Sequence, residues 1–160
     1  MSLSPRVTAQ CDLLSRKAWY ETMGCFDDAG IYQAWDFAQE IFPRQGVSRM
    51  VVHVGDRLVG MAQVRIATVP VFKRGIAYVY WGPLWRRNKT EDLEDLKNVA
   101  AALKNEYAHR RCLLLRMAPN ISSENVDACR LFVELGFVRA EREPYRTVSV
   151  DIARTLEDIR

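Results

Sequence analysis

Residues 125–137 decide the fold of this chain, and they read NVDACRLFVELGF. They predict a helix that is capped at Ser123 or a neighbouring residue and that runs through Leu135. Gly136 is expected to end this helix, because glycine readily adopts the left-handed backbone conformation of helix C-termini. Short strands are expected on either side, over residues 112–117 and 137–141. The stretch is therefore read as a strand–helix–strand unit of an α/β domain.

A further helix is predicted upstream of this unit. Thr90 is expected to cap it, because the acidic residues that follow, Glu91 and Asp92, suit the positive end of a helix dipole. Apolar side chains at helical spacing form one face of this helix: Leu93, Leu96, Val99, Ala100, Leu103 and Tyr107.

Three strands in antiparallel order are predicted before that helix. Residues 49–54 and 57–68 are rich in β-branched side chains, and the Gly-Asp pair between them is typical of a tight hairpin. A third strand is expected over residues 76–81, where a Gly-Pro pair then stops it. These strands predict a meander.

The two ends of the chain complete the pattern. Residues 12–23 and 31–41 have helical periodicity, whereas residues 1–10 have none and decide nothing. A last strand is expected over residues 146–152, and residues 155–160 begin another helix. The predicted fold class is α/β, with a mixed, mostly antiparallel sheet flanked by helices.

Composition limits the class of protein. A chain of 160 residues and 18.4 kDa fits a single domain over residues 1–160, and 49% hydrophobic residues with few glycines and prolines exclude a disordered chain. No apolar run approaches the roughly 20 residues that span a bilayer, and the first residues do not resemble a secretory signal. A cytoplasmic location is therefore expected.

The cysteines do not predict a metal site. Cys11, Cys25, Cys112 and Cys129 have no CxxC spacing, and the chain has two histidines. We expect free thiols and no bound metal.

Positive charge is concentrated in one segment. Residues 57–90 contain seven Lys or Arg and no Asp or Glu, although the net charge of the whole chain is +3. Such a segment indicates an anionic partner such as a phosphate, a nucleic acid or a lipid headgroup, or else a solvated surface.

The order of elements resembles the Gcn5-related N-acetyltransferase (GNAT) superfamily. Residues 125–137 look like its helix motif N-x-x-A-x-x-x-[YF]-x-x-x-GF, and the preceding strand fits as well. The resemblance implies the fold of the acyl-CoA N-acyltransferases.

Other segments resemble the Fem-type (FemABX-like) peptidoglycan aminoacyltransferases. They read IYQAW (31–35), GMA (60–62), YVYWGPL (78–84), LRMAPN (115–120) and YRTVSVDI (145–152). Enzymes of that family move an amino acid from aminoacyl-tRNA to a lipid-linked or nucleotide-linked muropeptide, and they usually have two such domains. The resemblance implies that residues 1–160 are a single GNAT-like domain and could form the first half of a two-domain enzyme.

The segment before the predicted Thr90 helix bears on the cofactor. Acetyl-CoA enzymes of the superfamily have a glycine-rich loop there, whose free N–H groups bind pyrophosphate. Here the segment has one glycine, a proline and two tryptophans. Coenzyme A is therefore expected to be unlikely, with no other cofactor and with aminoacyl-tRNA as co-substrate if the chain is Fem-type. Arg86, Arg87 and Lys89 could hold a phosphate or be solvated.

No catalytic base is identified in the sequence. The third strand has no carboxylate or histidine, and His53 is read as a sheet residue. Positioning of an activated ester donor could supply much of the rate. The expected substrate-binding residues are Tyr78, Tyr80, Arg86, Arg87, Tyr145 and Arg146. The tryptophans Trp35, Trp81 and Trp85 are read as core or interface.

The sequence thus predicts an aminoacyltransferase-like transferase that acts on an amine of a cell-envelope precursor, in peptidoglycan cross-bridge or exopolysaccharide synthesis. Two alternatives remain: a stand-alone N-acyltransferase that uses coenzyme A, and a non-catalytic domain that binds a muropeptide, a nucleotide sugar or another protein. The expected partners are an anionic precursor, aminoacyl-tRNA, and a second copy of the chain or a second domain.

Overall fold

The computed structural model describes residues 6–41, 46–69 and 74–141. The central element is a five-stranded sheet with the order β1-β2-β3-β4-β5. Its strands are β1 (Val7–Cys11), β2 (Gly46–Val54), β3 (Arg57–Val69), β4 (Arg74–Tyr80) and β5 (Leu114–Ala118). All neighbouring strands are antiparallel except β4 and β5, which are parallel. The predicted fold class, a mixed and mostly antiparallel sheet with helices, is confirmed.

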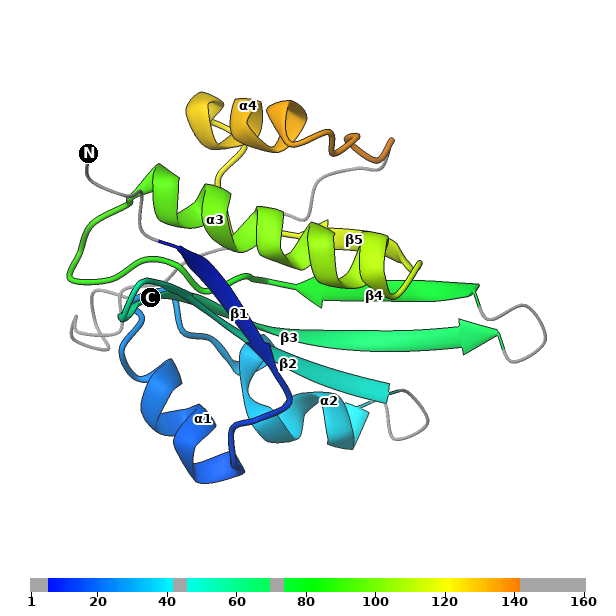
Figure 1. Cartoon of the computed structure of the whole chain (residues 1–160). Helices are drawn as coiled ribbons and strands as arrows, with labels where there is room; N and C mark the ends of the chain where they lie inside the picture. Colours follow the sequence, from blue (N-terminus) through cyan, green and yellow to red (C-terminus); the bar gives the residue numbers. More distant parts are fainter. Residues whose placement is uncertain (1–5, 42–45, 70–73, 142–160) are drawn as a thin grey trace, which may run out of the picture.

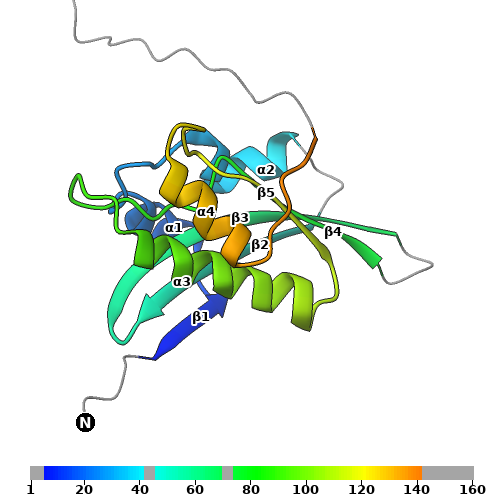
Figure 2. The same cartoon turned by 90° about the horizontal axis from the view of Figure 1, so that it is seen from above.

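Helices cover both faces of the sheet (Figure 1). On one face lie α3 (Leu93–Leu103), its π-helical continuation η2 (Lys104–Arg110) and, outside α3, α4 (Val126–Glu134). On the other face lie α1 (Arg16–Met23), the 3-10 turn η1 (Ile31–Gln33) and α2 (Trp35–Ile41). Figure 2 shows the same layers from above, with α3 crossing the strands.

Alternation along the strands divides the core into two layers. Val52 and Ala62 pack in the cluster beneath α3, whereas the adjacent Val51 and Met61 pack against Trp19 of α1. Successive side chains of a strand point to opposite faces, so β2 and β3 contribute to both layers. Such a sheet is buried on both sides, which is consistent with its nearly continuous apolar strands.

The structure corrects the start of the helix predicted after Thr90. The cap is Asp92, whose carboxylate accepts a hydrogen bond from the amide of Glu94, and α3 begins at Leu93. Thr90 is unavailable as a cap because its hydroxyl donates to the carbonyl of Arg87, 2.6 Å away, within a tight turn.

The helix in residues 125–137 is confirmed, but the strand predicted after it is wrong. Asn125 caps α4, and Gly136 has a φ of 77°. The amides of Gly136 and Phe137 donate to the carbonyls of Val133 and Phe132, and the two phenylalanine rings pack with centroids 5.5 Å apart. This is a Schellman motif, so Phe137 completes the helix end and no strand forms over residues 137–141.

Two further differences lie near the N-terminus. Residues 7–11 form β1, which begins within the segment over residues 1–10 that had no helical period. The predicted helix over 31–41 is divided at Ala34 into η1 and α2. The strand predicted over 146–152 and the helix over 155–160 lie outside the described residues. In the part of the chain that is described, no helix is both long and apolar enough to cross a bilayer.

Candidate functional site

A β-bulge interrupts the pairing of β4 with β3. Val79 lies opposite Val64, but the next paired residue after β4 is Leu84, which lies opposite Met61 and exchanges two backbone hydrogen bonds of 2.9 and 3.0 Å with it. Residues 80–83 therefore bulge out of the ladder, and Trp81 has a φ of 48°. Bulges often lie beside functional sites, where they redirect side chains and open a sheet.

The side chain of Gln33 fills this bulge. Its Nε2 donates to the carbonyl of Tyr80 at 2.7 Å, and its Oε1 accepts from the backbone amide of Gln63 at 2.6 Å. Gln33 is fully buried. The bulge leaves the Tyr80 carbonyl and the Gln63 amide without partners in the strand ladder, and the Gln33 side chain forms a hydrogen bond with each. Buried polar groups generally have such partners.

The same bulge opens the sheet between β4 and β5. Their parallel ladder ends at Tyr80 and Ala118, because the chain beyond Tyr80 turns back toward β3 at Leu84. Across this opening, Arg86 Nη1 donates to the carbonyl of Asn120 at 2.8 Å. The carboxylate of Glu91 in turn accepts from Arg86 and from the N-cap Asn125. The motif asparagine is thus connected to the opening through two polar contacts.

Aromatic rings line the sheet face at the end of β4. Tyr32 stacks on Trp81, with ring centroids 5.9 Å apart, and meets Tyr80 edge-on at 4.7 Å. Tyr78 lies beside Tyr80, and the guanidinium of Arg65 lies 5.0 Å from the centre of the Tyr78 ring. Burial lowers the pKa of Arg65 from its usual value. The face combines flat apolar surfaces with a cation.

Two aspartates bind the backbone of the segment that follows the bulge. Asp28 accepts from the amides of Trp85 and Arg86 at 3.2–3.3 Å, and Asp27 accepts from the amide of Lys89 at 2.6 Å. The Asp28 carboxylate is 3% exposed and lies 3.9 Å from the Arg86 guanidinium. Burial raises the pKa of Asp28, and the amide of Trp85 and the charge of Arg86 oppose this shift.

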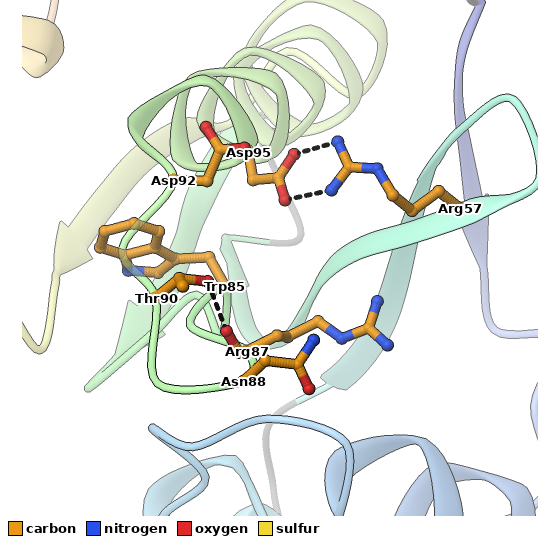
Figure 3. A pocket seen from close by; sticks show the side chains of 7 residues that line it. All are labelled: Arg57, Trp85, Arg87, Asn88, Thr90, Asp92 and Asp95. Carbon is orange, nitrogen blue, oxygen red and sulfur yellow. Dashed lines mark hydrogen bonds and ion pairs between the residues drawn. The ribbon is translucent and has the colours of Figure 1, made fainter.

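A pocket of about 260 Å³ lies between this segment, the start of β3 and the first turn of α3 (Figure 3). Its lining residues are Arg57, Trp85, Arg87, Asn88, Thr90, Asp92 and Asp95. The buried carboxylate of Asp95 accepts two hydrogen bonds of 2.6 and 2.7 Å from Arg57, so these two charged residues of the pocket pair with each other. We therefore place the functional site at the bulge rather than here.

The predicted site residues fall into three groups. Tyr78 and Tyr80 lie side by side on β4, with ring centroids 5.8 Å apart. Arg86 lies in the segment after the bulge, where it binds Glu91 and the carbonyl of Asn120. Arg87 lies near the start of β3, where its Nη1 donates to the carbonyl of Leu58. Its buried Nε has no hydrogen-bond acceptor among the described residues. Tyr145 and Arg146 lie outside the described residues. His53 is half-buried on β2 between Thr8 and Leu58.

The tryptophans divide between core and surface. Trp85 is 2% exposed and packs against Leu96 and α4, so it is a core residue, whereas Trp35 and Trp81 are partly exposed. The four cysteines are free, and no group of three or more metal-ligating side chains occurs within residues 6–41, 46–69 and 74–141.

Sequence reasoning missed Gln33, Asp27 and Asp28. Asp27 and Asp28 stand in a segment between Gly24 and Gly30 that indicated only a loop, and Gln33 lies in the helix predicted over residues 31–41. Their partners are backbone groups of residues 30 to 62 positions further along the chain, and no local pattern reveals such contacts.

No protein-family model matches the sequence, and no curated protein sequence does. Solved structures do match. One is FemX, with a TM-score of 0.62 and 16% identity, over 79% of this chain and 31% of that one. Another is an aminoglycoside acetyltransferase from an uncultured soil metagenomic sample in complex with trehalose, with a TM-score of 0.52 and 10% identity, over 91% and 97%. A third is aminoglycoside N-acetyltransferase AAC(6')-Iy in complex with CoA, with a TM-score of 0.52 and 13% identity, over 94% and 99%.

The chain has the fold of the GNAT N-acyltransferases. It spans about a third of FemX and nearly the full length of the two acetyltransferases. At these identities the likeness concerns the fold alone.

The expectation that coenzyme A is unlikely is wrong, because a structure of this fold holds CoA. The expectation rested on the missing glycines, but N–H groups bind a phosphate, and any residue except proline can supply them. Here the amides of Trp85, Arg86 and Lys89 point to oxyanions although none of the three is a glycine. This segment thus directs N–H groups to negatively charged oxygens without a glycine.

Proposed function

We propose that this protein is an N-acyltransferase that moves an acyl or aminoacyl group from an activated donor to an amine. The observation that carries the proposal is the bulge at residues 80–83, which separates β4 from β5 beside Tyr32, Tyr80 and Trp81. Acyltransferases of the same fold, including FemX and the aminoglycoside acetyltransferases, support this reaction class.

The reaction requires few groups from the protein. The amine nitrogen attacks the donor carbonyl, an N–C bond forms, the C–S or C–O bond to the leaving group breaks, and the leaving group takes up the proton that the amine loses. An activated ester or thioester makes orientation the main requirement. The aromatic face can hold an acceptor against Tyr32 and Tyr80, and the opening between the strands can admit the donor.

Coenzyme A would supply a thioester that activates the acyl group. The backbone amides of Trp85, Arg86 and Lys89 are the groups that would hold its pyrophosphate, with the Arg86 guanidinium nearby. Aminoacyl-tRNA would supply an activated ester, and its phosphates would suit the same groups.

The finer proposal is aminoacyl transfer to a cell-envelope precursor on the cytoplasmic side. The Fem-type segments of the sequence and the likeness to FemX support it. The precursor would be a nucleotide-linked or lipid-linked muropeptide or a precursor of an exopolysaccharide. On this proposal the chain acts as one half of a two-domain enzyme or together with a second copy.

A transfer assay with a panel of donors tests the reaction class. Purified protein is incubated with acetyl-CoA or aminoacyl-tRNA and with amine acceptors that include a nucleotide-linked muropeptide, and products are detected by mass spectrometry. We expect an amide product with one donor class, and the active donor distinguishes coenzyme A chemistry from aminoacyl transfer.

Two matched variants connect any activity to the site. Tyr32→Ala removes the ring that contacts Tyr80 and Trp81, and Tyr20→Ala removes a ring of similar exposure on α1. Tyr32→Ala is expected to raise the KM for the acceptor, whereas Tyr20→Ala leaves it unchanged. Equal effects of the two substitutions would show that the acceptor binds elsewhere.

A further inference from the structure

Two arginines flank Tyr78 on the sheet face that carries the aromatic rings. Arg65 of β3 lies opposite Tyr78 of β4, and Tyr78 is in register with Arg116 of β5. We propose that Arg65 and Arg116 form a carboxylate-binding subsite, so that the aromatic face takes an acceptor that carries a carboxylate and disfavours a polycationic amine. That the ligand is an acceptor rests on the proposed function, whereas the subsite itself does not.

The strand register places the three side chains on one face of the sheet. The residues next to them in the strands pack in or against the core cluster beneath α3: Val64, Val79 and Met117. Because successive side chains of a strand point to opposite faces, Arg65, Tyr78 and Arg116 lie on the side of η1 and α2. Neighbouring strands are about 4.8 Å apart, so the two arginines are about 10 Å apart at their Cα atoms, with Tyr78 between them.

The strands of this face carry positive charge without negative charge. β2, β3, β4 and β5 contain no Asp or Glu. Arg116 is exposed, and in the part of the chain that the structure describes its guanidinium forms no ion pair and no hydrogen bond. A guanidinium presents a planar fork of N–H donors that matches the two oxygens of a carboxylate.

Arg65 supplies a cation that is already directed to the rings. Its guanidinium lies 5.0 Å from the centre of the Tyr78 ring and 5.8 Å from that of Tyr80. Burial lowers the pKa of Arg65, and a carboxylate beside it would favour its charged form. Since this guanidinium lies against both rings, less of their surface remains for a cationic ligand.

The subsite lies close to the opening between β4 and β5. The parallel ladder ends at Tyr80 and Ala118, two positions beyond Tyr78 and Arg116. Two strand positions correspond to about 7 Å. A ligand whose carboxylate lies between the arginines would therefore reach the opening with a group about 7 Å away, and on the proposed function that group is the reacting amine.

Three small probes with the same ring and different charges test the subsite: phenylacetate, its neutral isostere 2-phenylacetamide, and the cation 2-phenylethylamine. Dissociation constants are measured at fixed ionic strength by ¹H–¹⁵N NMR, from the amide signals of Tyr78, Tyr80 and Arg116. The variants are Arg116→Gln and Arg116→Glu. Arg130→Gln is the matched control, because it removes another exposed arginine, on α4 at the opposite face of the sheet (Figure 1).

Wild-type protein is expected to bind phenylacetate more tightly than the other two probes. Arg116→Gln should weaken phenylacetate binding about threefold to tenfold, because a charged hydrogen bond at an exposed position is lost, and should leave 2-phenylacetamide binding unchanged. Arg116→Glu should prefer 2-phenylethylamine to phenylacetate. Arg130→Gln should behave as the wild type does. Because the Arg116 side chain is exposed and has no described partner, both of its variants should keep the fold.

Four results would overturn the proposal. They are no binding of phenylacetate by the wild type, equal affinity for the three probes, equal losses in Arg116→Gln and Arg130→Gln, or binding that leaves the three amide signals unmoved. The probes include no acyl donor, so the result is separate from that of the transfer assay. Probe binding as expected without amide formation would refute the reaction class alone, and amide formation without probe binding would refute the subsite alone.

Discussion

Gln33 donates a hydrogen bond of 2.7 Å to the carbonyl of Tyr80, a residue 47 positions away in the sequence. Together with the bond that Gln33 accepts from the Gln63 amide, this contact replaces the pairing that the bulge removes between β3 and β4. The bulge is therefore a regular part of the sheet, and the side chain of Gln33 in η1 stabilises it.

Gln33→Ala is predicted to destabilise the protein. The substitution leaves the Gln63 amide and the Tyr80 carbonyl buried without their partner, which costs about 2 to 4 kcal/mol of unfolding free energy. Chemical denaturation measures this loss. Gln10→Ala is the matched control, because Gln10 is exposed on β1, and it should change the free energy little. A Gln33→Ala variant as stable as the Gln10→Ala variant would show that the contact contributes nothing.

Gly82→Ala is predicted to disturb the same contact from the other side. A Cβ atom at Gly82 would lie 2.7 Å from Gln33 Nε2, too close for a packed pair, whereas a Cβ at Gly30 would meet no atom within 4 Å. Gly82→Ala should lower the melting temperature, and Gly30→Ala should not. In the double variant Gln33→Ala/Gly82→Ala the obstacle is absent, so the two losses should be less than additive.

The pKa values of Asp28 and Asp36 are predicted to shift in opposite directions from the usual value of an aspartate. Burial raises the pKa of Asp28 above 3.8, and hydrogen bonds from Arg16 and Tyr20 lower the pKa of Asp36 below it. Carboxyl ¹³C NMR measures both midpoints. An Asp28 midpoint at or below that of Asp36 would contradict the buried position of Asp28.

The two shifts have opposite effects on stability. Between 3.8 and its raised pKa, folded Asp28 keeps a proton that the unfolded chain has released, so its contribution to the free energy of unfolding decreases as pH rises through that range. Folded Asp36 has already lost its proton between its lowered pKa and 3.8, so its contribution decreases as pH falls through that range.

Much of the fold could be predicted from local sequence. Alternating β-branched residues and a Gly-Asp turn predicted β2 and β3, and Gly136 marked the end of α4. Strand β1 was not predictable in the same way, because four of its five residues are exposed and its partner β2 lies far along the chain. Local patterns thus identified the helices and strands whose own apolar side chains are buried, and they missed the mostly exposed strand β1.

The candidate site was predictable only in part. Tyr78 and Tyr80 were identified because they share one face of a strand, and Arg86 because it stands in a basic segment. Gln33 and Asp28 form hydrogen bonds with backbone groups of distant residues. Nearly every residue type has the same backbone groups, so the sequence does not distinguish the residues that are the partners. Such contacts appear only when the topology brings the segments together.

Self-association is a further prediction. Two exposed isoleucines lie at the ends of the η1–α2 segment, with Ile31 67% exposed and Ile41 56% exposed. Exposed apolar surface is commonly covered in a two-fold dimer, and the partly exposed Trp35 and Trp81 are candidates for the same contact. Sedimentation equilibrium over a hundredfold range of concentration should show a mass above that of the 18.4 kDa monomer. A constant monomer mass would refute the dimer.

The strand order also determines when the site is assembled during folding. Strands β2, β3 and β4 pair in the order in which they follow one another along the chain, but Leu114 of β5 pairs with Ile76 of β4 across about 40 residues of intervening chain. Loop closure over that distance is slow relative to hairpin formation. The opening beside Tyr80 is therefore expected to form late in folding, when β5 docks beside β4 and supplies the second of its two walls.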